Sequence, residues 1–506
     1  MLYHPPTQPY CGLTIILSNP SRFDKDALLS GAAGIKFNDE CLAPNGVTRW
    51  HCEIRTSEDR RGLIDGTKCL LLLGDKAFAD WVNPNYAKDY TLNEQRGYPL
   101  STPYQNVQAI CSYLPQEAFD LKDYESKLNP LLLADAADTS NQAVDDEDDS
   151  DVKRHGRTSH SNYFFWLQRD AAKALAACRQ VPRPSSYDVT LAPSSNEIIK
   201  LLSETHSTSL YLDIETDISD RNLLCVGFSF GEADSGNRVY VVPFLRWNYV
   251  IAYNDYAAIL RAFSIALRRN TIICHNAMFD LGILAHKYSL PFGSAIYDTM
   301  LAQHRCFPEA EKSLGHALSC WPSIWEPFHK DEGVFPPRNP DQEKQLWNYN
   351  AKDVWAMKLI KRAQQEYAQN DLGLQASIGQ ANRMIRPYII SMLQGMRFRN
   401  DIRTKTLNEN DRLMTHYLRA LRILVGRELL PTSPQQCAKY LFQELEYPVQ
   451  YKTDKGNPST GDKAIQKLKL KFPNNAVLDF ILAYRERAKE SGQLKFKPWI
   501  EPKIIA

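Results

Sequence analysis

The stretch SLYLDIET at residues 209–216 ends an apolar, strand-like run with two carboxylates, Asp213 and Glu215. Side chains two positions apart on a strand point to the same face, so both acids face one side. Burying carboxylates without partners is costly, and bound divalent cations are one such partner. Two-metal sites hold their ions about 4 Å apart and clamp both oxygens of an in-line phosphoryl displacement. The stretch therefore indicates phosphodiester chemistry with hard, oxygen-ligated cations such as Mg²⁺.

The residues that follow predict a sheet around this strand. LLCVGFSF at 223–230 and RVYVVPF at 238–244 are two more strand candidates with turn residues between them. An amphipathic helix is expected over 253–269, then a strand over TIICHN at 271–276 and a helix over 277–288. This order predicts an α/β fold in which a mixed sheet carries helices on its faces.

Two further acids are expected to join the first pair. Asp280 falls in the first turns of the helix after TIICHN. Tyr349 and Asp353 are four residues apart, so on a helix they share a face. Asp353 is expected to complete the metal shell, and the phenol of Tyr349 to orient the attacking water.

Composition sets the limits of the remaining predictions. The chain has 506 residues, too many for one hydrophobic core, and its net charge of +1 means that any nucleic-acid surface must come from local clustering. The 11 cysteines form no C-x-x-C pair, which is typical of reduced thiols in a cytosolic compartment. No run approaches the length of a membrane span, and no secretory signal is recognised, so a cytoplasmic protein without membrane contact is expected.

The pattern divides the chain into several parts. An α/β block is expected over 1–133, because GLTIILSN and KCLLLLGDKAF are short apolar runs bounded by turn residues. Residues 134–160 are strongly acidic and almost free of large apolar side chains, which predicts a flexible linker; an acidic tether that mimics DNA is the alternative. A connecting helical segment is expected over 161–194. The part after 378 is predicted to be helical, and Tyr451 to Lys503 holds 12 Lys or Arg against 6 Asp or Glu.

The acidic segments also resemble a known family. DIET at 213–216, HNAMFD at 275–280 and YNAKD at 349–353 resemble the three motifs of the DEDDy-type proofreading exonuclease of family A, polymerase I-like, DNA polymerases. YDTMLAQH at 297–304 and KSLGHALS at 312–319 are similar to further pieces of that domain. The resemblance implies an RNase H-like exonuclease domain over 195–377, with a DNA 3′ end as its substrate.

Carried over residue by residue, the resemblance implies a site for two Mg²⁺ (or Mn²⁺) ions. Asp213, Glu215 and Asp353 would hold the first ion. Asp213 would bridge to the second, and Asp280 would reach it through water. Tyr349 would position the nucleophilic water.

The same resemblance implies which residues line the pocket for the terminal nucleotide. Asn276, Phe279 and Thr216 occupy the matching positions. For Phe279, a place in the hydrophobic core is an equally open interpretation.

The helical region also resembles family A polymerases. IISMLQGMRFRND at 389–401 is similar to the start of the polymerase domain, and TSPQQCAKYLFQEL and KGNPSTGDKAIQKL are similar to its thumb. Residues 378–506 would then be a partial polymerase domain whose basic side chains meet duplex phosphates, with an ordinary solvated helix pair as the alternative. The palm and fingers motifs are absent, so polymerisation by this chain alone is not expected and a separate palm and fingers chain is an expected partner.

The first block resembles uracil-DNA glycosylase-like domains. LLLLGDKAF at 70–78, RGYPL at 96–100 and ICSYLPQE at 110–117 carry the resemblance. The family's His-Pro-Ser segment reads Leu114-Pro115-Gln116 here, so residues 1–133 are expected to be degenerate and non-catalytic. An unrelated α/β accessory domain is the alternative.

Together these features predict a 3′→5′ proofreading exonuclease of a replicative family A polymerase, and by resemblance a phage source. Two other functions are open. One is a DNA-binding assembly subunit of a split polymerase, and the other is a nuclease that acts alone in repair or degradation.

Overall fold

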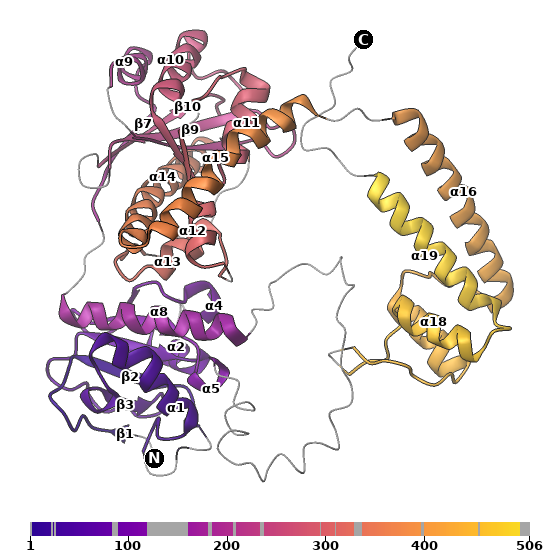
Figure 1. Ribbon diagram of the computed structural model, residues 1–506, viewed down its shortest axis with the longest axis horizontal. Coiled ribbons are helices and arrows are strands. Elements are labelled where there is room, and N and C mark those ends of the chain that lie inside the picture. The colour runs from indigo at the N-terminus through magenta and orange to yellow at the C-terminus, as the bar shows by residue number, and fades with distance from the viewer. Residues whose placement is uncertain are drawn as a thin grey trace. The chain divides into compact units, whose positions relative to one another are not determined.

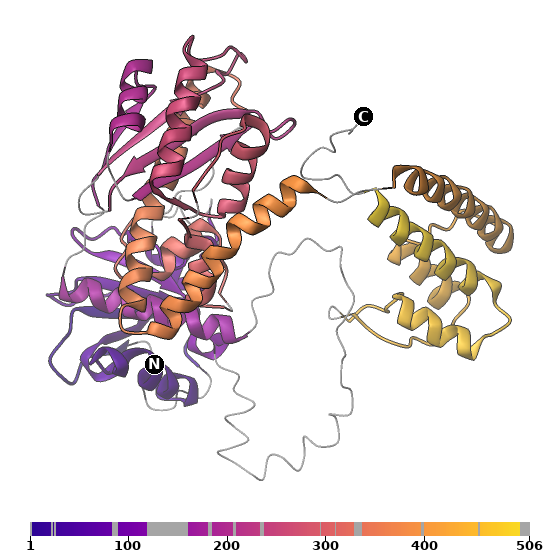
Figure 2. The ribbon, with the colours of Figure 1, turned by 45° about the horizontal axis from the view of Figure 1, so that its top comes forward.

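The computed structural model describes residues 3–21, 24, 27–82, 90–118, 160–180, 185–205, 209–232, 237–293, 295–308, 310–327, 336–395, 399–453 and 456–495. Contacts divide the chain into two compact units, Met1–Leu393 and Gln394–Ala506. Residues 134–159 of the predicted acidic linker lie outside the described residues. Among the described helices, none combines the length and the apolar character that a membrane crossing needs. Figures 1 and 2 show the elements in two views.

The first unit begins with a six-stranded sheet in the order β1-β3-β2-β4-β6-β5. The four central strands β3, β2, β4 and β6 are parallel, and the short β1 and β5 pair antiparallel at the two edges. Every residue of β2 and β4 is buried, as expected of central parallel strands that are covered on both faces. The strands are β1 (Tyr3–His4), β2 (Leu13–Leu17), β3 (Glu53–Thr56), β4 (Cys69–Leu73), β5 (Leu100–Ser101) and β6 (Gln108–Ser112).

Helices cover this sheet, and the longest of them is α8. Its residues Leu167, Ala171 and Leu175 are buried in the same core as Ile15 and Leu71 of the sheet. The helical elements of this block are α1 (Ala32–Phe37), η1 (Asn38–Leu42), η2 (Ala43–Asn45), η3 (Arg49–His51), α2 (Asp75–Trp81), α4 (Leu92–Gln95), α5 (Pro115–Ala118) and α8 (His160–Arg179). The α/β block predicted ahead of the linker is therefore confirmed.

A second six-stranded sheet follows, in the order β12-β11-β8-β9-β10-β7. β9 is antiparallel to both β8 and β10, whereas β11, β12 and β7 join by parallel pairing. The strands are β7 (Asp188–Leu191), β8 (Ser209–Thr216), β9 (Leu223–Phe230), β10 (Arg238–Pro243), β11 (Thr271–Cys274) and β12 (Ile296–Asp298). The mixed sheet, and with it the multidomain α/β fold class, is confirmed.

One expectation about this sheet was wrong. Within the segment 161–194, predicted as a helical connection, helix α8 ends at Arg179 and Asp188–Leu191 forms the edge strand β7. This strand has four residues, two exposed and two half-buried, so its sequence carries no apolar run. Parallel pairing with β10 decides its conformation, and that pairing is not visible in the local sequence.

Helices cover both faces of the second sheet. Ile198 of α9, Phe263 of α10 and Leu281 of α11 are buried with Leu212 of β8 on one face, and Val354 of α14 is buried with other strands on the opposite face. Figures 1 and 2 show α10 and α14 on opposite sides of the strands. The helices are α9 (Ser195–Glu204), α10 (Tyr256–Arg269), α11 (Ala277–Tyr288), α12 (Thr299–Cys306), α13 (Leu314–Cys320), α14 (Pro340–Ala368) and α15 (Leu372–Gln394).

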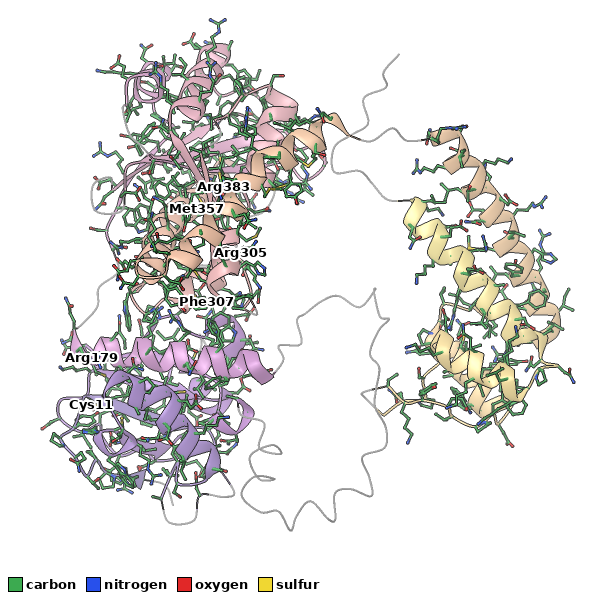
Figure 3. All side chains as sticks on the ribbon, in the orientation of Figure 1. Cys11, Arg179, Arg305, Phe307, Met357 and Arg383 are labelled. Carbon is green, nitrogen blue, oxygen red and sulfur yellow. The ribbon has the colours of Figure 1, made fainter. Side chains whose placement is uncertain are left out.

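A buried polar network joins α8 and the first sheet to α13. Asp170 of α8 accepts hydrogen bonds from Arg96 at 2.8 Å and from Ser112 at 2.6 Å, and Arg96 also donates to Ser319 of α13 at 2.7 Å. Nearby, the guanidinium of Arg169 lies 5.1 Å from the ring centroid of Phe307, which is labelled in Figure 3. Breaking a buried charge pair is costly, so this network fastens α8 and the first sheet to α13.

The second unit is helical, as predicted. Its core is formed by Leu421, Leu441, Ile465, Leu478 and Ile481, and α16 packs along α19. The elements are α16 (Asn400–Val425), α17 (Pro434–Ala438), η5 (Lys439–Glu444), α18 (Asp462–Lys471) and α19 (Ala476–Leu494).

Candidate metal centre

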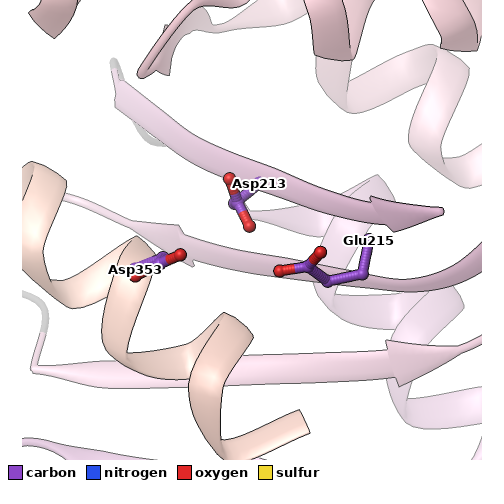
Figure 4. Close-up of side chains that lie close together, drawn as sticks. All are labelled: Asp213, Glu215 and Asp353. Carbon is purple, nitrogen blue, oxygen red and sulfur yellow. The ribbon is translucent and has the colours of Figure 1, made fainter. Parts of the chain in front are cut away.

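Three of the predicted carboxylates meet at one point. Asp213 and Glu215 extend from β8, and Asp353 extends from α14 toward them (Figure 4). One carboxylate oxygen from each lies within 4.8 Å of the corresponding oxygen of the other two. A set of hard oxygen donors at this spacing fits Mg²⁺ or Mn²⁺, which take carboxylate ligands.

The alternation of β8 explains why its two acids point the same way. Leu210, Leu212 and Ile214 are buried in the core beneath α10 and α11, so the residues between them face α14. The β8–β9 ladder shifts register between Glu215 and Thr216, and regular pairing therefore ends at the site. Irregularities of this kind are common beside active sites, where they redirect a strand.

The N-terminus of α14 is fixed by capping, and this determines where along the helix axis Asp353 lies. Asn339 caps the helix by accepting from the backbone N–H of Gln342 at 2.9 Å, and Pro340 occupies the first turn, where its missing N–H costs nothing. Val354 beside Asp353 is completely buried. Asp353 is therefore presented from a rigid, packed helix.

Asn350 orients Asp213, and the sequence interpretation missed it. Its side-chain amide donates to Asp213 Oδ2 at 2.6 Å and lies 3.3 Å from the carbonyl oxygen of the same residue. Asn350 is completely buried and is one helical turn from Asp353. The available signal was its position three residues before Asp353, which places both on one helix face.

Gly227 makes the contact between β9 and α14 possible. It lies opposite Asp213 in the β8–β9 ladder. A Cβ atom on Gly227 would stand 2.3 Å from Asn350 Oδ1 and 2.8 Å from a methyl carbon of Val354. Its signal in the sequence was a glycine inside the apolar run LLCVGFSF, since glycine in a strand often marks a close approach of another element.

The electrostatics of the centre are governed by burial and by the closeness of several acids. Burial raises the pKa of Asp213 well above its ordinary value, and the charges of Glu215, Asp280 and Asp353 raise it further. The hydrogen bond from Asn350 acts in the opposite direction on this pKa. Burial also raises the pKa of Asp280 to about 8, against the hydrogen bond from the Ile214 amide. Divalent cations at this point would favour the ionised carboxylates.

Asp280 lies next to the three-carboxylate group but not within it. It is in the first turn of α11, and its Oδ1 accepts from the backbone N–H of Ile214 at 3.1 Å. The backbone of β8 between Asp213 and Glu215 therefore holds Asp280 in place. The carboxylate of Asp280 is not part of the group of oxygens that Asp213, Glu215 and Asp353 bring together, as the carboxylate of a direct ligand would be.

The turn into α11 is held by Asp298, a third residue that the sequence interpretation did not single out. Its carboxylate accepts from the backbone N–H groups of Asn276 at 3.1 Å and Ala277 at 2.8 Å, and it also caps α12. Asn276 has a left-handed conformation with φ of 72°, and its side chain is exposed. Asp298 thus fixes the backbone from which both Asn276 and Asp280 project.

The remaining predicted residues surround the centre. Tyr349 is half-buried on α14, one turn before Asp353, and Thr216 is buried at the end of β8. Phe279 is half-buried and packs against the core beneath the sheet, with the guanidinium of Arg221 5.7 Å from its ring centroid. Part of the Phe279 ring therefore packs in the hydrophobic core, as one interpretation proposed, and the rest of the ring is exposed.

The raised pKa of Asp280 predicts a pH-dependent stability of the metal-free protein. Between the ordinary pKa of 3.8 and about 8, the folded chain keeps a proton on Asp280 that the unfolded chain has lost. The free energy of unfolding should therefore fall as the pH rises through this range and stay low above it. We expect the unfolding temperature in EDTA to drop between pH 6 and pH 9, and to drop less in Asp280→Asn, whose amide oxygen can still accept from Ile214. Equal drops in the two proteins would show that Asp280 is not the responsible group.

Comparison with known proteins gives little further information. No protein-family model matches the sequence, and no curated protein matches it. Among solved structures, the chain is similar to the POL domain of Pol1 from M. smegmatis in complex with DNA primer-template and dNTP, with a TM-score of 0.45 and 17% identity. The match covers 60% of this chain and 49% of that one, so it spans about half the length of the polymerase chain. The carboxylate geometry, and not this coarse likeness, is the basis for the function proposed below.

Proposed function

We propose that the chain is a metal-dependent 3′→5′ exodeoxyribonuclease with an RNase H-like nuclease domain over 195–377, the proofreading part of a family A replicative polymerase. The observation that carries the proposal is the meeting of Asp213, Glu215 and Asp353 from two elements far apart in the sequence. Bringing three acids to one point costs free energy, because the carboxylates repel one another and are partly removed from water. A divalent cation offsets that cost.

The residues present fit a two-metal centre. Two such cations, when bound, make a water acidic enough to attack and neutralise the charge that develops on the phosphate. Asp213, Glu215 and Asp353 would hold one ion, and Asp213 would be shared with the second. Asp280, fastened to the β8 backbone, would act on the second ion through water. Asn350 keeps Asp213 in its orientation, and the Tyr349 phenol orients the attacking water.

The side chains around the carboxylate centre are proposed to bind the 3′-terminal nucleotide of the substrate. Thr216, Asn276 and Phe279 would contact the terminal nucleotide, with the exposed amide of Asn276 free to reach a sugar or base. The Arg221 guanidinium beside Phe279 would add a contact to a phosphate. These contacts hold the strand in line for hydrolysis, which is the main contribution a protein makes to phosphoryl transfer.

The second unit is proposed to bind duplex phosphates as a thumb-like domain. Lys463, Lys467 and Lys471 of α18 recur every four residues and are all exposed, so they form one basic stripe. Such a stripe gives sequence-independent, salt-sensitive affinity for DNA.

The first block is proposed to be a degenerate uracil-DNA glycosylase-like domain without catalysis, in a cytoplasmic protein of phage origin. The carboxyl ends of its parallel strands, where ligands bind in open α/β sheets, are tightly packed. A Cβ on Gly74 there would stand 2.6 Å from Ser18 Oγ and 2.9 Å from Leu114, which is itself buried. The Arg96–Asp170–Ser319 network supports a role as a fixed platform for the nuclease domain.

A nuclease assay tests the proposal directly. With Mg²⁺, a 5′-labelled single strand should shorten one nucleotide at a time, and the same strand labelled at its 3′ end should release labelled mononucleotide at once. EDTA should stop both reactions, because the carboxylates alone cannot activate water. A circular single strand should stay intact. Internal cutting of the circle, or release of the 5′ label first, would contradict an exonuclease of this polarity.

A further inference from the structure

A short hairpin follows β10 at the edge of the sheet where β8 ends. Residues 245–251, here called the β10 hairpin, are closed by a bridge between Leu245 and Ile251 and by a hydrogen bond from Arg246 N to Val250 O at 2.9 Å. Tyr249 at its tip has a left-handed backbone with φ of 62°. A non-glycine residue in this conformation indicates that the surroundings hold the hairpin in one shape.

The first anchor of the β10 hairpin is Glu343, in the first turn of α14. The guanidinium of Arg246 donates to both oxygens of this carboxylate, at 2.8–3.0 Å, and the backbone N–H of Trp247 donates to it at 2.8 Å. Glu343 is buried, and Arg246 also lies over the ring of Trp347. A bidentate pair of this kind fixes direction as well as distance. The helix that carries Asp353 thus also holds the hairpin.

The second anchor connects the β10 hairpin to the metal-ligand strand. The hydroxyl of Tyr249 donates to Asp217 Oδ2 at 3.2 Å, and Asp217 is two residues beyond Glu215. β8 and β10 run parallel on either side of β9, so their ends lie at the same edge, roughly 10 Å apart. The hairpin is therefore next to the carboxylate centre.

The outer surface of the β10 hairpin is apolar. More than half of the surface of Tyr249, Val250 and Ile251 is exposed, as is that of Ile218 in the turn after β8, and Trp247 is 37% exposed. Single exposed apolar side chains are ordinary, but a group of them that is rigidly held beside a candidate catalytic site indicates a binding surface. Arg221, in the same turn as Ile218, is half-buried, and its guanidinium lies 5.7 Å from the ring centroid of Phe279.

We propose that the β10 hairpin and Ile218 form a surface on which unpaired bases of the DNA strand stack when its 3′ end is in the carboxylate centre. This inference rests on the proposed nuclease function and adds the way in which the substrate strand is held. Aromatic and flat apolar surfaces bind bases of any sequence, because every base has a π-face. Single-stranded DNA is favoured over a protein partner because Ile218 is only three residues from Glu215 of the carboxylate centre and shares its turn with Arg221.

The test uses Trp247→Ala/Val250→Ser in the full chain, which removes exposed surface and keeps both anchors, Arg246 and Tyr249. The substrates are a 12-nucleotide single strand and the p-nitrophenyl ester of thymidine 5′-monophosphate, which is too short to reach the hairpin. We expect KM for the oligonucleotide to rise about 5- to 150-fold, the range for loss of stacking on one base, and the ester to be cleaved at an unaltered rate. Leu372→Ala, at an exposed position on α15, should change neither.

Each other outcome decides against one specific statement. An unchanged KM for the oligonucleotide would overturn the stacking surface, and so would equal losses on both substrates, because the hairpin would then support the centre itself. A change confined to the oligomeric state in size-exclusion chromatography would assign the surface to a second copy of the chain. If the unaltered protein cleaves neither substrate, the nuclease proposal fails, and fluorescence anisotropy with the labelled oligonucleotide still tests the surface. Equal affinity of variant and unaltered protein in that measurement would overturn it.

Discussion

Asp353→Ala is expected to lower the rate of 3′-end hydrolysis by about a thousandfold while the chain stays folded. The substitution removes one of the three carboxylates that meet at the centre. Metal-assisted stabilisation of developing charge contributes several kcal/mol, and a loss of about 4 kcal/mol corresponds to a factor of a thousand in rate. The measurement is single-turnover digestion of a 5′-labelled strand at saturating Mg²⁺, with a thermal melt of the same preparation.

The folded state of this variant is expected to be unharmed or slightly stabilised without metal. One acid fewer in the cluster relieves repulsion on Asp213, whose pKa is raised partly by the charge of Asp353. The matched control is Glu366→Gln, which neutralises an exposed acid on the same helix and should leave digestion unchanged. Tyr349→Phe should slow digestion less than the loss of Asp353. Full activity in Asp353→Ala would remove the metal assignment, and an unchanged rate in Tyr349→Phe would remove only the water-orienting role.

Gly227→Ala is expected to lower both the stability of the first unit and its nuclease activity. The added methyl group would stand 2.3 Å from Asn350 Oδ1, closer than atoms of a folded protein approach, so α14 must move away from β9. Overpacking of a close-packed interior costs about 1–3 kcal/mol. The same movement pulls Asn350 off Asp213 and displaces Asp353, and small misplacements of catalytic groups cost about a hundredfold in rate.

The matched control for this substitution is Gly379→Ala in α15. A Cβ there would meet only the far end of the Arg383 side chain, at 3.4 Å, and Ala stabilises a helix interior by up to about 1 kcal/mol relative to Gly. Opposite signs of the two stability changes in urea unfolding would show that the effect comes from the β9–α14 contact. A Gly227→Ala protein with normal activity and stability would mean that α14 does not depend on this close approach.

Much of the second sheet was predictable because its strands carry strong local signals. β8, β9 and β11 are apolar runs bounded by turn residues, and the helices after β10 and β11 show helical periodicity. β7 carries no such signal, since two of its four residues are exposed and its strand conformation comes from pairing with β10. The pairing joins residues about 50 positions apart, so the four residues of β7 alone do not reveal it.

The candidate site was predicted in the same uneven way. Asp213 and Glu215 could be paired by strand alternation, and Tyr349 and Asp353 by helical spacing, because both are short-range periodicities. These short-range periodicities do not reveal the supporting residues Asn350, Gly227 and Asp298. Their roles depend on contacts between helices and strands that are far apart in the sequence. The position of Asp280 against the Ile214 amide, outside the group of three acids, is likewise a result of packing.

The sequence by itself determined which acids face one way and which elements carry them, because the periods of strand and helix are properties of the local chain. Only the tertiary structure decided that α14 packs closely against β8 and β9. This packing brings oxygen atoms of the three carboxylates within 4.8 Å of one another. That approach depends on the missing side chain of Gly227 and the buried amide of Asn350, and close packing of this kind exists only between elements that are already folded.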